Sequence, residues 1–153
     1  MEQLITIDNV SYQVDGKEIL KNISLEIERG EILSILGNNG SGKSTLLGIL
    51  LDDFKPSSGR VIYHPSKREV MRNVGVLYSN QLLFPLLKVK ELIRYFASIY
   101  NLEESAYDHI IDVFDLRKLE DRQVKALSQG ERMKLSVLLA VFHRPAFLVM
   151  DEP

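Results

Sequence analysis

Nine consecutive residues, from Gly37 to Thr45, combine three glycines with a lysine and three hydroxyl side chains. They fit the pattern G-x-x-x-x-G-K-[ST]. The glycines allow backbone N–H groups to turn inward and form an anion-binding nest. The Lys43 ammonium is a mobile charge that can follow phosphate groups, and the Ser44 hydroxyl is a hard oxygen suited to Mg²⁺. The pattern therefore predicts a loop that binds the phosphates of a nucleoside triphosphate together with Mg²⁺.

The flanks of this loop agree with that interpretation. Residues 32–36 are almost continuously apolar, which predicts a parallel strand buried on both faces. Residues 45–51 predict a helix that is apolar nearly all round and hence buried. The residues expected to contact the nucleotide are Gly37, Asn38, Asn39, Gly40, Ser41, Gly42, Lys43, Ser44 and Thr45.

A pair of acidic residues forms the second candidate site. Asp151 and Glu152 follow the apolar residues 147–150, which predict a buried strand. Ligands of parallel sheets bind beyond the carboxyl ends of the strands. If this strand neighbours the one before the loop, Asp151 holds Mg²⁺ and Glu152 orients or deprotonates the attacking water. An acidic pair that merely ends a strand is the alternative.

The third motif is the run from Leu127 to Glu131, which reads L-S-Q-G-E. Ser128 and Glu131 fit the capping box S-x-x-E, which predicts the start of a helix over residues 130–143. A capped helix N-terminus is also an anion site, so both functions are compatible.

The remaining elements follow from periodicity. Alternating apolar residues predict two strands around Asp15-Gly16, a favoured hairpin turn, and further strands over residues 61–63 and 74–77. Helical spacing predicts a helix over residues 89–100. Ser105, with Asp108, predicts the cap of another helix.

The composition excludes several classes of protein. The 153 residues carry a formal net charge of −2 and no cysteine, so neither a basic nucleic-acid surface nor a disulfide or cysteine-metal site is predicted. We find no signal-peptide pattern and no apolar run long enough to span a bilayer.

The three motifs, in this order and spacing, resemble the ATP-binding cassette family, the ATPase subunits of ABC transporters. The run from Leu127 to Glu131 matches the family signature L-S-G-G-Q, from which Gln129 and Glu131 depart. Residues 150–153 match the end of the Walker B strand. Tyr12 falls where the family places an aromatic ring that stacks on adenine, and a half-buried strand aromatic is the alternative.

The resemblance implies an α/β fold: a P-loop NTPase core with an N-terminal antiparallel β subdomain and a helical subdomain. Residues 1–153 are then a partial domain that lacks its C-terminal part. The core comprises about residues 1–78 and 145–153, and the helical subdomain about residues 79–144. We expect this chain, made by itself, to be poorly stable.

The sequence departs from the family pattern at two positions of the nucleotide site. The position of the glutamine-loop residue, which touches Mg²⁺, falls on Ser79, with Gln81 two residues later, and either can serve. The family's switch histidine has no counterpart, because His143 precedes the acidic pair and is interpreted as a helix-end residue.

The function implied is the ATP-binding and ATP-hydrolysing subunit of a bacterial ABC transporter, with Glu152 and Lys43 catalytic and Mg²⁺ as cofactor. Two such domains dimerise head to tail, so Ser128, Gln129, Gly130 and Glu131 serve the partner's ATP. Separate membrane permease subunits dock near residues 82–90 and hold the protein at the cytoplasmic face of the membrane. The alternatives are a non-hydrolysing nucleotide-binding fragment and a soluble ATPase of the repair or translation type.

Overall fold

The computed structural model describes residues 2–78 and 83–151, and it divides into two compact units, residues 1–72 and 73–153. The assignment of residues 1–78 and 145–153 to one core therefore stays a prediction.

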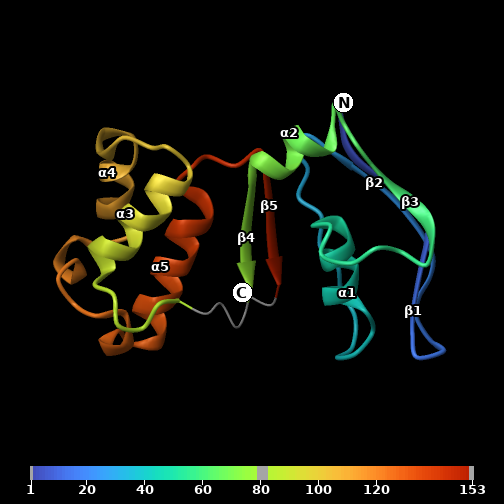
Figure 1. Ribbon diagram of the computed structural model, residues 1–153, viewed down its shortest axis with the longest axis horizontal. Helices are drawn as coiled ribbons and strands as arrows, with labels where there is room; N and C mark the ends of the chain where they lie inside the picture. The colour runs from blue at the N-terminus through green and yellow to red at the C-terminus, as the bar shows by residue number, and fades with distance from the viewer. Residues whose placement is uncertain (1, 79–82, 152–153) are drawn as a thin grey trace. The chain divides into compact units, whose positions relative to one another are not determined.

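The first unit is built on an antiparallel sheet with the strand order β2-β1-β3 (Figure 1). The strands are β1 (Gln3–Val14), β2 (Lys17–Glu28) and β3 (Ser58–Tyr63). Val14 pairs with Lys17 across a two-residue turn in which Asp15 and Gly16 have φ angles of 48° and 76°. Positive φ at both positions defines the type I′ turn, so the predicted hairpin is confirmed.

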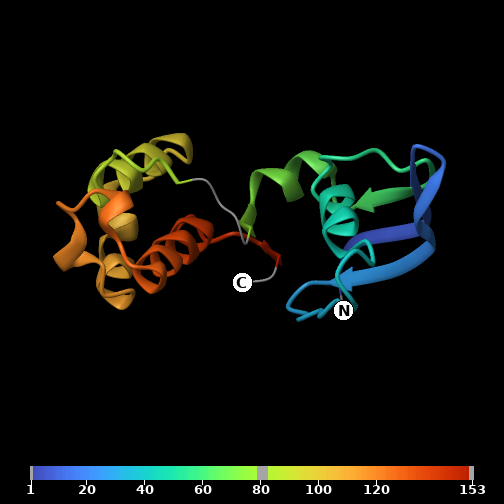
Figure 2. The same cartoon turned by 90° about the horizontal axis from the view of Figure 1, so that it is seen from below.

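Helix α1 (Lys43–Leu50) lies alongside this sheet, as Figures 1 and 2 show. The sheet and the helix share an apolar core, which explains why the helix is buried along most of its length. The short helix α2 (Lys67–Arg72) ends the unit. The core side chains of the sheet and of α1 are Leu4, Ile5, Ile7, Val10, Leu20, Ile27, Leu46, Ile49 and Leu50.

The strand predicted over residues 32–36 is wrong for this structure. Residues 31–38 have no regular secondary structure, and the side chains of Ile32 and Leu36 are 94% and 91% exposed. An apolar strand needs hydrogen-bonding neighbours and cover on both faces. Among the described residues of the first unit, the sheet consists of β1, β2 and β3 and gives this segment no strand partner.

The second unit joins a parallel strand pair to a group of helices (Figure 1). The strands β4 (Val74–Tyr78) and β5 (Phe147–Asp151) pair in register from Val74 with Phe147 to Tyr78 with Asp151. In β5, Val149 is buried, whereas Leu148 is 39% and Met150 50% exposed. The predicted buried strand is therefore buried at Val149 but exposed at Leu148 and Met150.

The helices of this unit are α3 (Val89–Ile99), α4 (Glu104–Val113) and α5 (Gln129–Val141), with the 3-10 turns η1 (Arg117–Leu119) and η2 (Val124–Ala126). They pack around one apolar cluster. Its fully buried members include Val89, Leu92, Leu116, Leu135 and Leu138.

Of the two predicted helix caps, the one at Ser128 is confirmed and the one at Ser105 is wrong. Helix α5 begins at its predicted capping box: Ser128 Oγ accepts a hydrogen bond from the Glu131 N–H, and Glu131 Oε2 accepts one from the Ser128 N–H. The predicted cap by Ser105 is wrong, because α4 begins at Glu104 after an extended Glu103. Ser105 therefore lies inside the first helical turn, where it cannot act as the cap.

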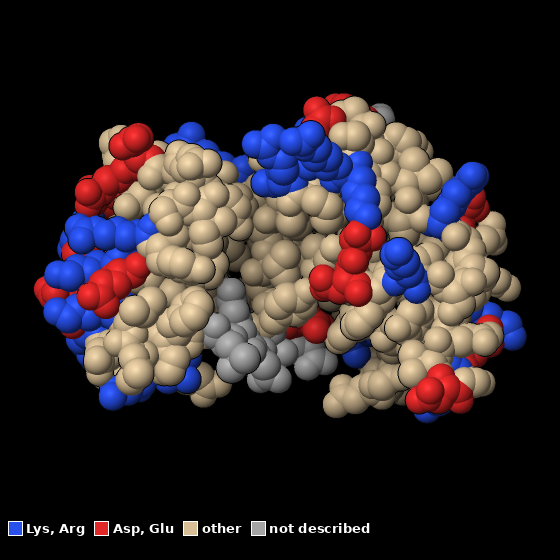
Figure 3. Space-filling view, viewed as in Figure 1, with Lys and Arg blue, Asp and Glu red and all other residues tan. Residues whose placement is uncertain are grey.

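The fold class is thus as predicted, an α/β protein with an antiparallel β subdomain and a helical subdomain. On the face drawn in Figure 3, positive and negative side chains intermingle over the helical part of the second unit. No helix among the described residues is both long enough and apolar enough to cross a membrane.

Candidate nucleotide-binding site

The loop before α1 owes its shape to its glycines. Gly40 and Gly42 have φ angles of 79° and 95°, in the left-handed region that side chains other than glycine rarely adopt. Gly37 differs from these two, since its φ is not positive and a Cβ at this position would lie 2.7 Å from the Ser41 Oγ atom. Two of the three glycines thus supply the backbone conformation, and the third allows a close approach.

Lys43 is the first residue of α1, and its side chain folds back over the loop. Its Nζ atom donates hydrogen bonds to the carbonyl oxygens of Gly37, at 3.0 Å, and Asn38, at 3.2 Å. The ammonium group therefore lies at the loop that the motif assigns to phosphate, rather than extending away from it. A flexible four-carbon stem allows such an ammonium to move onto an anion.

The N-terminus of α1 completes the loop. The first helical hydrogen bond runs from the Leu46 N–H to the Gly42 carbonyl at 2.9 Å, so the positive end of the helix dipole faces the loop. Ser44 is exposed and Thr45 half-buried in the first turn. The geometry therefore combines a positive side chain, a helix N-terminus and an exposed hydroxyl, which suit a Mg²⁺-bound polyphosphate.

Tyr12 belongs to the β1–β2 strand pair, which approaches this loop through Leu20 at Gly42. It lies opposite Leu20 in the β1–β2 pairing, and a Cβ added to Gly42 would lie 2.8 Å from Leu20 Cδ2. The half-buried Tyr12 ring also packs against Phe54, with the ring centroids 5.8 Å apart and the planes tilted by 37°. The predicted adenine-stacking residue therefore lies on the strand paired with the one that reaches Gly42, and its stacking role stays a prediction.

Phe54 is a residue that the sequence analysis missed. A Cβ at Gly48 of α1 would lie 2.5 Å from the Phe54 ring, so the glycine leaves the space that the ring occupies. Phe54 therefore packs against Tyr12 and against α1 at Gly48. The signal was a glycine inside an apolar helix, a position that usually has a packing reason.

The acidic pair lies in the second unit. Asp151 ends β5 opposite Tyr78 of β4, so both parallel strands present their carboxyl ends at the same edge. This is the edge at which α/β sheets bind ligands. Glu152, Ser79 and Gln81 lie outside the described residues, and their predicted roles stay predictions. The approach of Asp151 to the loop of the first unit also stays a prediction.

Mg²⁺ fits these donors only as part of a complex with the nucleotide. Among residues 2–78 and 83–151, no three His, Cys, Asp or Glu side chains gather closely enough to hold a metal ion. Mg²⁺ usually takes one or two protein oxygens and completes its shell with water and phosphate. The Ser44 hydroxyl and the Asp151 carboxylate are donors of this type.

The signature segment lies at the N-terminus of α5. Ser128, Gln129 and Gly130 are exposed, and a Cβ added to Gly130 would meet no atom within 4 Å. Hydrogen bonds from the backbone and side chain of Ser128 lower the pKa of the Glu131 carboxyl, and nearby Arg122 and Lys118 add to this effect. The segment is an ordered, open helix start.

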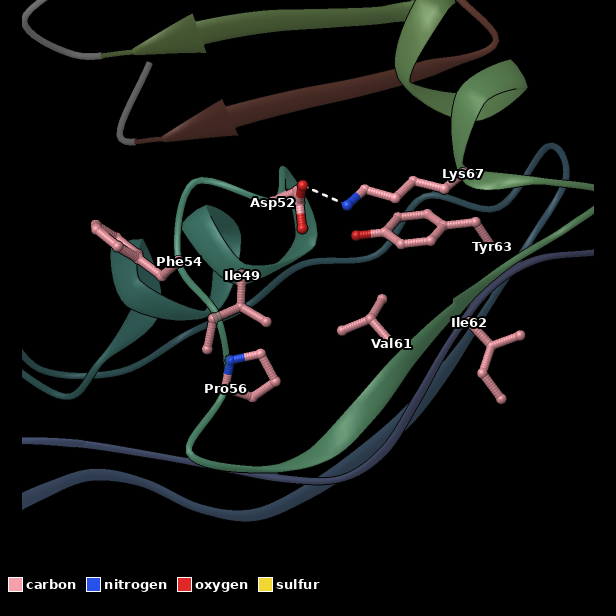
Figure 4. A pocket seen from close by; sticks show the side chains of 8 residues that line it. All are labelled: Ile49, Asp52, Phe54, Pro56, Val61, Ile62, Tyr63 and Lys67. Atoms are coloured by element: carbon pink, nitrogen blue, oxygen red, sulfur yellow. Dashed lines mark ion pairs between the residues drawn. The ribbon is translucent and has the colours of Figure 1, made fainter.

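A separate cavity of about 410 Å³ lies in the first unit at the C-terminal end of α1 (Figure 4). Its polar side consists of the Asp52–Lys67 ion pair and Tyr63, whose hydroxyl donates to the Leu50 carbonyl at 3.2 Å. Burial, with the Asp52 charge nearby, raises the pKa of Tyr63 to about 12. The cavity includes no predicted site residue. Its lining residues are Ile49, Asp52, Phe54, Pro56, Val61, Ile62, Tyr63 and Lys67.

Comparison with known proteins identifies the family. The family model described as "ABC transporter" matches residues 20–153. The chain belongs to the ABC transporter family, as a member of its ATP-binding proteins.

Individual relatives agree with this assignment. The chain is 33% identical over 158 residues to the uncharacterized ABC transporter ATP-binding protein YdbJ of Bacillus subtilis (strain 168), covering 99% of this chain and 51% of that protein. It is also 33% identical over 158 residues to the spermidine/putrescine import ATP-binding protein PotA of Spiroplasma citri, covering 98% of this chain and 45% of that protein. The chain thus spans about half the length of these relatives.

A solved structure also matches the fold. The structure of CbiO1 from Clostridium perfringens, described as part of the ABC transporter complex CbiONQ, superposes with a TM-score of 0.82 and 27% identity. This match covers 100% of this chain and 66% of that one. Together these findings confirm the predicted family and fold class.

Proposed function

We propose that this chain is the nucleotide-binding part of a bacterial ABC transporter subunit that binds and hydrolyses Mg-ATP. The observation that carries the proposal is the loop before α1, with Gly40 and Gly42 in the left-handed conformation and Lys43 Nζ over the loop carbonyls. This arrangement presents backbone N–H groups, an ammonium and a helix N-terminus to one anion.

The residues of the site take separate roles in this proposal. Lys43 and the loop bind the phosphates, and the Tyr12 ring stacks on the adenine. Ser44 and Asp151 hold Mg²⁺, with Ser79 or Gln81 as a further contact. Mg²⁺ would neutralise charge that develops on the phosphates, and Glu152 would orient or deprotonate the attacking water.

A second ATP-binding domain, identical or homologous, completes the proposed site. The exposed Ser128 and Gly130 at the start of α5 would contact the ATP held by the partner's loop. Support comes from the anion-binding character of a capped helix N-terminus.

Membrane permease subunits are the second class of partner that we propose. Three large apolar side chains are exposed in and just before α3: Phe84 is 50% and Leu86 67% exposed before the helix, and Tyr95 within it is 48% exposed. The Phe84 and Tyr95 rings contact each other edge to face at 5.6 Å. Exposed apolar surface of this kind favours a protein partner. Docking there would place the protein at the cytoplasmic face of a membrane.

Phosphate release by the full-length protein at saturating Mg-ATP tests the proposal. Turnover supports the ATPase function. Binding of Mg-ATP without turnover favours the alternative of a non-hydrolysing nucleotide-binding protein, and failure to bind Mg-ATP would overturn both.

A further inference from the structure

The signature of this chain contains an acidic residue where an anion is expected. Glu131 lies in the first turn of α5, the helix end that the proposed function assigns to the partner's ATP. A carboxylate stabilises a helix N-terminus, but it repels a polyphosphate that approaches the same place. The charge of Glu131 therefore has to be balanced if the segment is to accept an anion.

Arg122 supplies a balancing charge. Its Nη1 atom lies 3.2 Å from Glu131 Oε1, while Glu131 Oε2 accepts the Ser128 N–H at 2.8 Å. Both carboxylate oxygens are thus engaged within the chain. Arg122 Nη2 also donates a hydrogen bond to the Ala126 carbonyl, which ties the turn before the signature to the same guanidinium.

The backbone holds Arg122 in place for this contact. Its N–H donates to the Leu119 carbonyl at 2.9 Å, and its carbonyl accepts the Val89 N–H at 3.0 Å. Lys118 is also near Glu131, but its ammonium lies 2.7 Å from the carboxylate of Asp115. The side chains of Arg122 and Glu131 are 45% and 27% exposed, so their pairing is accessible to a nucleotide and to salt.

We propose that Arg122 is a positioning residue that neutralises Glu131 and keeps its carboxylate turned back onto the Ser128 cap. The open face formed by Ser128 and Gly130 can then accept the terminal phosphate of ATP bound by a second subunit. This inference rests on the proposed function, because it assigns that face to the partner's nucleotide.

Charge neutralisation and simple bracing of the turn predict different outcomes. If Arg122 acts by neutralising Glu131, Glu131→Gln makes Arg122 unnecessary. A glutamine oxygen can still accept the Ser128 N–H, since both Glu and Gln complete a capping box. If Arg122 only braces the Ala126 carbonyl, the same substitution does not help. A hydrogen bond that braces the Ala126 carbonyl is also less sensitive to salt than the neutralisation of an exposed carboxylate.

The test measures dimerisation of the full-length protein with Mg-ATP by sedimentation velocity, in a Glu152→Gln background that slows turnover. We expect Arg122→Gln to weaken the dimer about five- to tenfold, with a smaller effect at high salt. Arg122→Lys, which keeps the charge, should stay within about twofold of the parent. The pair Arg122→Gln with Glu131→Gln should dimerise more tightly than Arg122→Gln alone.

Arg117→Ala is the matched control. Arg117 pairs with Asp108, Asp112 and Glu120 and does not contact Glu131 in these ion pairs. The substitution removes the same positive charge as Arg122→Gln, and it should leave the dimer unchanged. Binding of a fluorescent ATP analogue by each monomer should also be unchanged, which shows that the loop of the first unit is intact.

The outcomes separate the two proposals. A parent protein that does not dimerise with Mg-ATP would overturn the proposed function. If the parent dimerises, two results would overturn the inference about Arg122 and leave the proposed function standing. One is an Arg122→Gln variant that dimerises as tightly as the parent. The other is a double variant that dimerises as weakly as Arg122→Gln alone.

Discussion

The imidazole ring of His143 lies parallel to the ring of Tyr100, with centroids 4.0 Å apart and an angle of 6° between the planes. Its Nε2 atom is 3.1 Å from the Val74 carbonyl at the start of β4. His143 therefore connects the end of α5 to a strand and to α3. It is a packing residue of the second unit, in agreement with its interpretation as a helix-end histidine.

Burial lowers the pKa of His143, with a smaller opposing effect from the hydrogen bond to Val74. The folded state therefore favours the neutral ring. Below the ordinary histidine pKa of about 6.5 the unfolded chain binds a proton more readily, so stability falls as the pH drops towards the folded-state pKa. Unfolding free energies between about pH 7.5 and 5 should show this loss in the wild type and less of it in His143→Phe.

The control for this titration is His109→Gln, which removes an exposed histidine of α4. Its unfolding free energies, measured at the same pH values, are the reference for losing a histidine elsewhere in the second unit. Equal slopes for the wild type and His143→Phe would show that another group causes the acid sensitivity.

Gly75 makes the tightest contact between β4 and the helices. A Cβ at this position would lie 2.1 Å from the Ala140 carbonyl oxygen and 2.9 Å from Pro145 Cγ. Gly75→Ala must therefore push the end of α5 away from β4. We expect a loss of about 1–3 kcal/mol or more in stability, measured by denaturant unfolding. Gly130→Ala, in open space, should cost far less, and equal losses for the two variants would contradict the close packing.

Exposed apolar side chains lead to a prediction for residues 1–153 expressed alone. Ile32 and Leu36 in the first unit, and Leu148 and Met150 on β5, are between 39% and 94% exposed. Such surfaces and an open strand edge promote association. Light scattering should show aggregates that grow with concentration, and Ile32→Ser with Leu36→Ser should reduce them. A monodisperse protein at high concentration would refute this expectation.

The local motifs were predictable from the sequence because their physics is local. The Asp15-Gly16 turn, the loop glycines and the Ser128 capping box each depend on residues within a few positions. The same logic could have found α2, since Ser66 Oγ accepts the Glu69 N–H at 3.4 Å in a further S-x-x-E pattern.

The long-range features were not predictable in this way. Apolar periodicity indicates that residues 32–36 suit a strand, but it does not say which neighbour pairs with them. The contact of Gly75 with α5 and the Arg122–Glu131 pair join residues from different parts of the second unit. A single sequence does not specify such contacts, because they depend on how the elements pack.

Glu152 carries the predicted catalytic step. In the full-length protein, Glu152→Gln should keep Mg-ATP binding and lose most turnover, because an amide preserves the shape of the carboxylate but cannot take a proton. The variant should also accumulate an ATP-bound dimer, visible by size-exclusion chromatography. Turnover near that of the wild type would exclude Glu152 as the general base.

The most direct test of the account is Mg-ATP binding by the full-length protein and its Lys43→Ala variant, measured by isothermal titration calorimetry. Lys43 contacts the loop carbonyls at 3.0 and 3.2 Å, at the predicted phosphate position. Loss of a charge-assisted contact costs about 2–3 kcal/mol, so the variant should bind about a hundredfold more weakly. Equal affinity of the two proteins, or no binding by the wild type, would contradict the assignment of this loop as the nucleotide site.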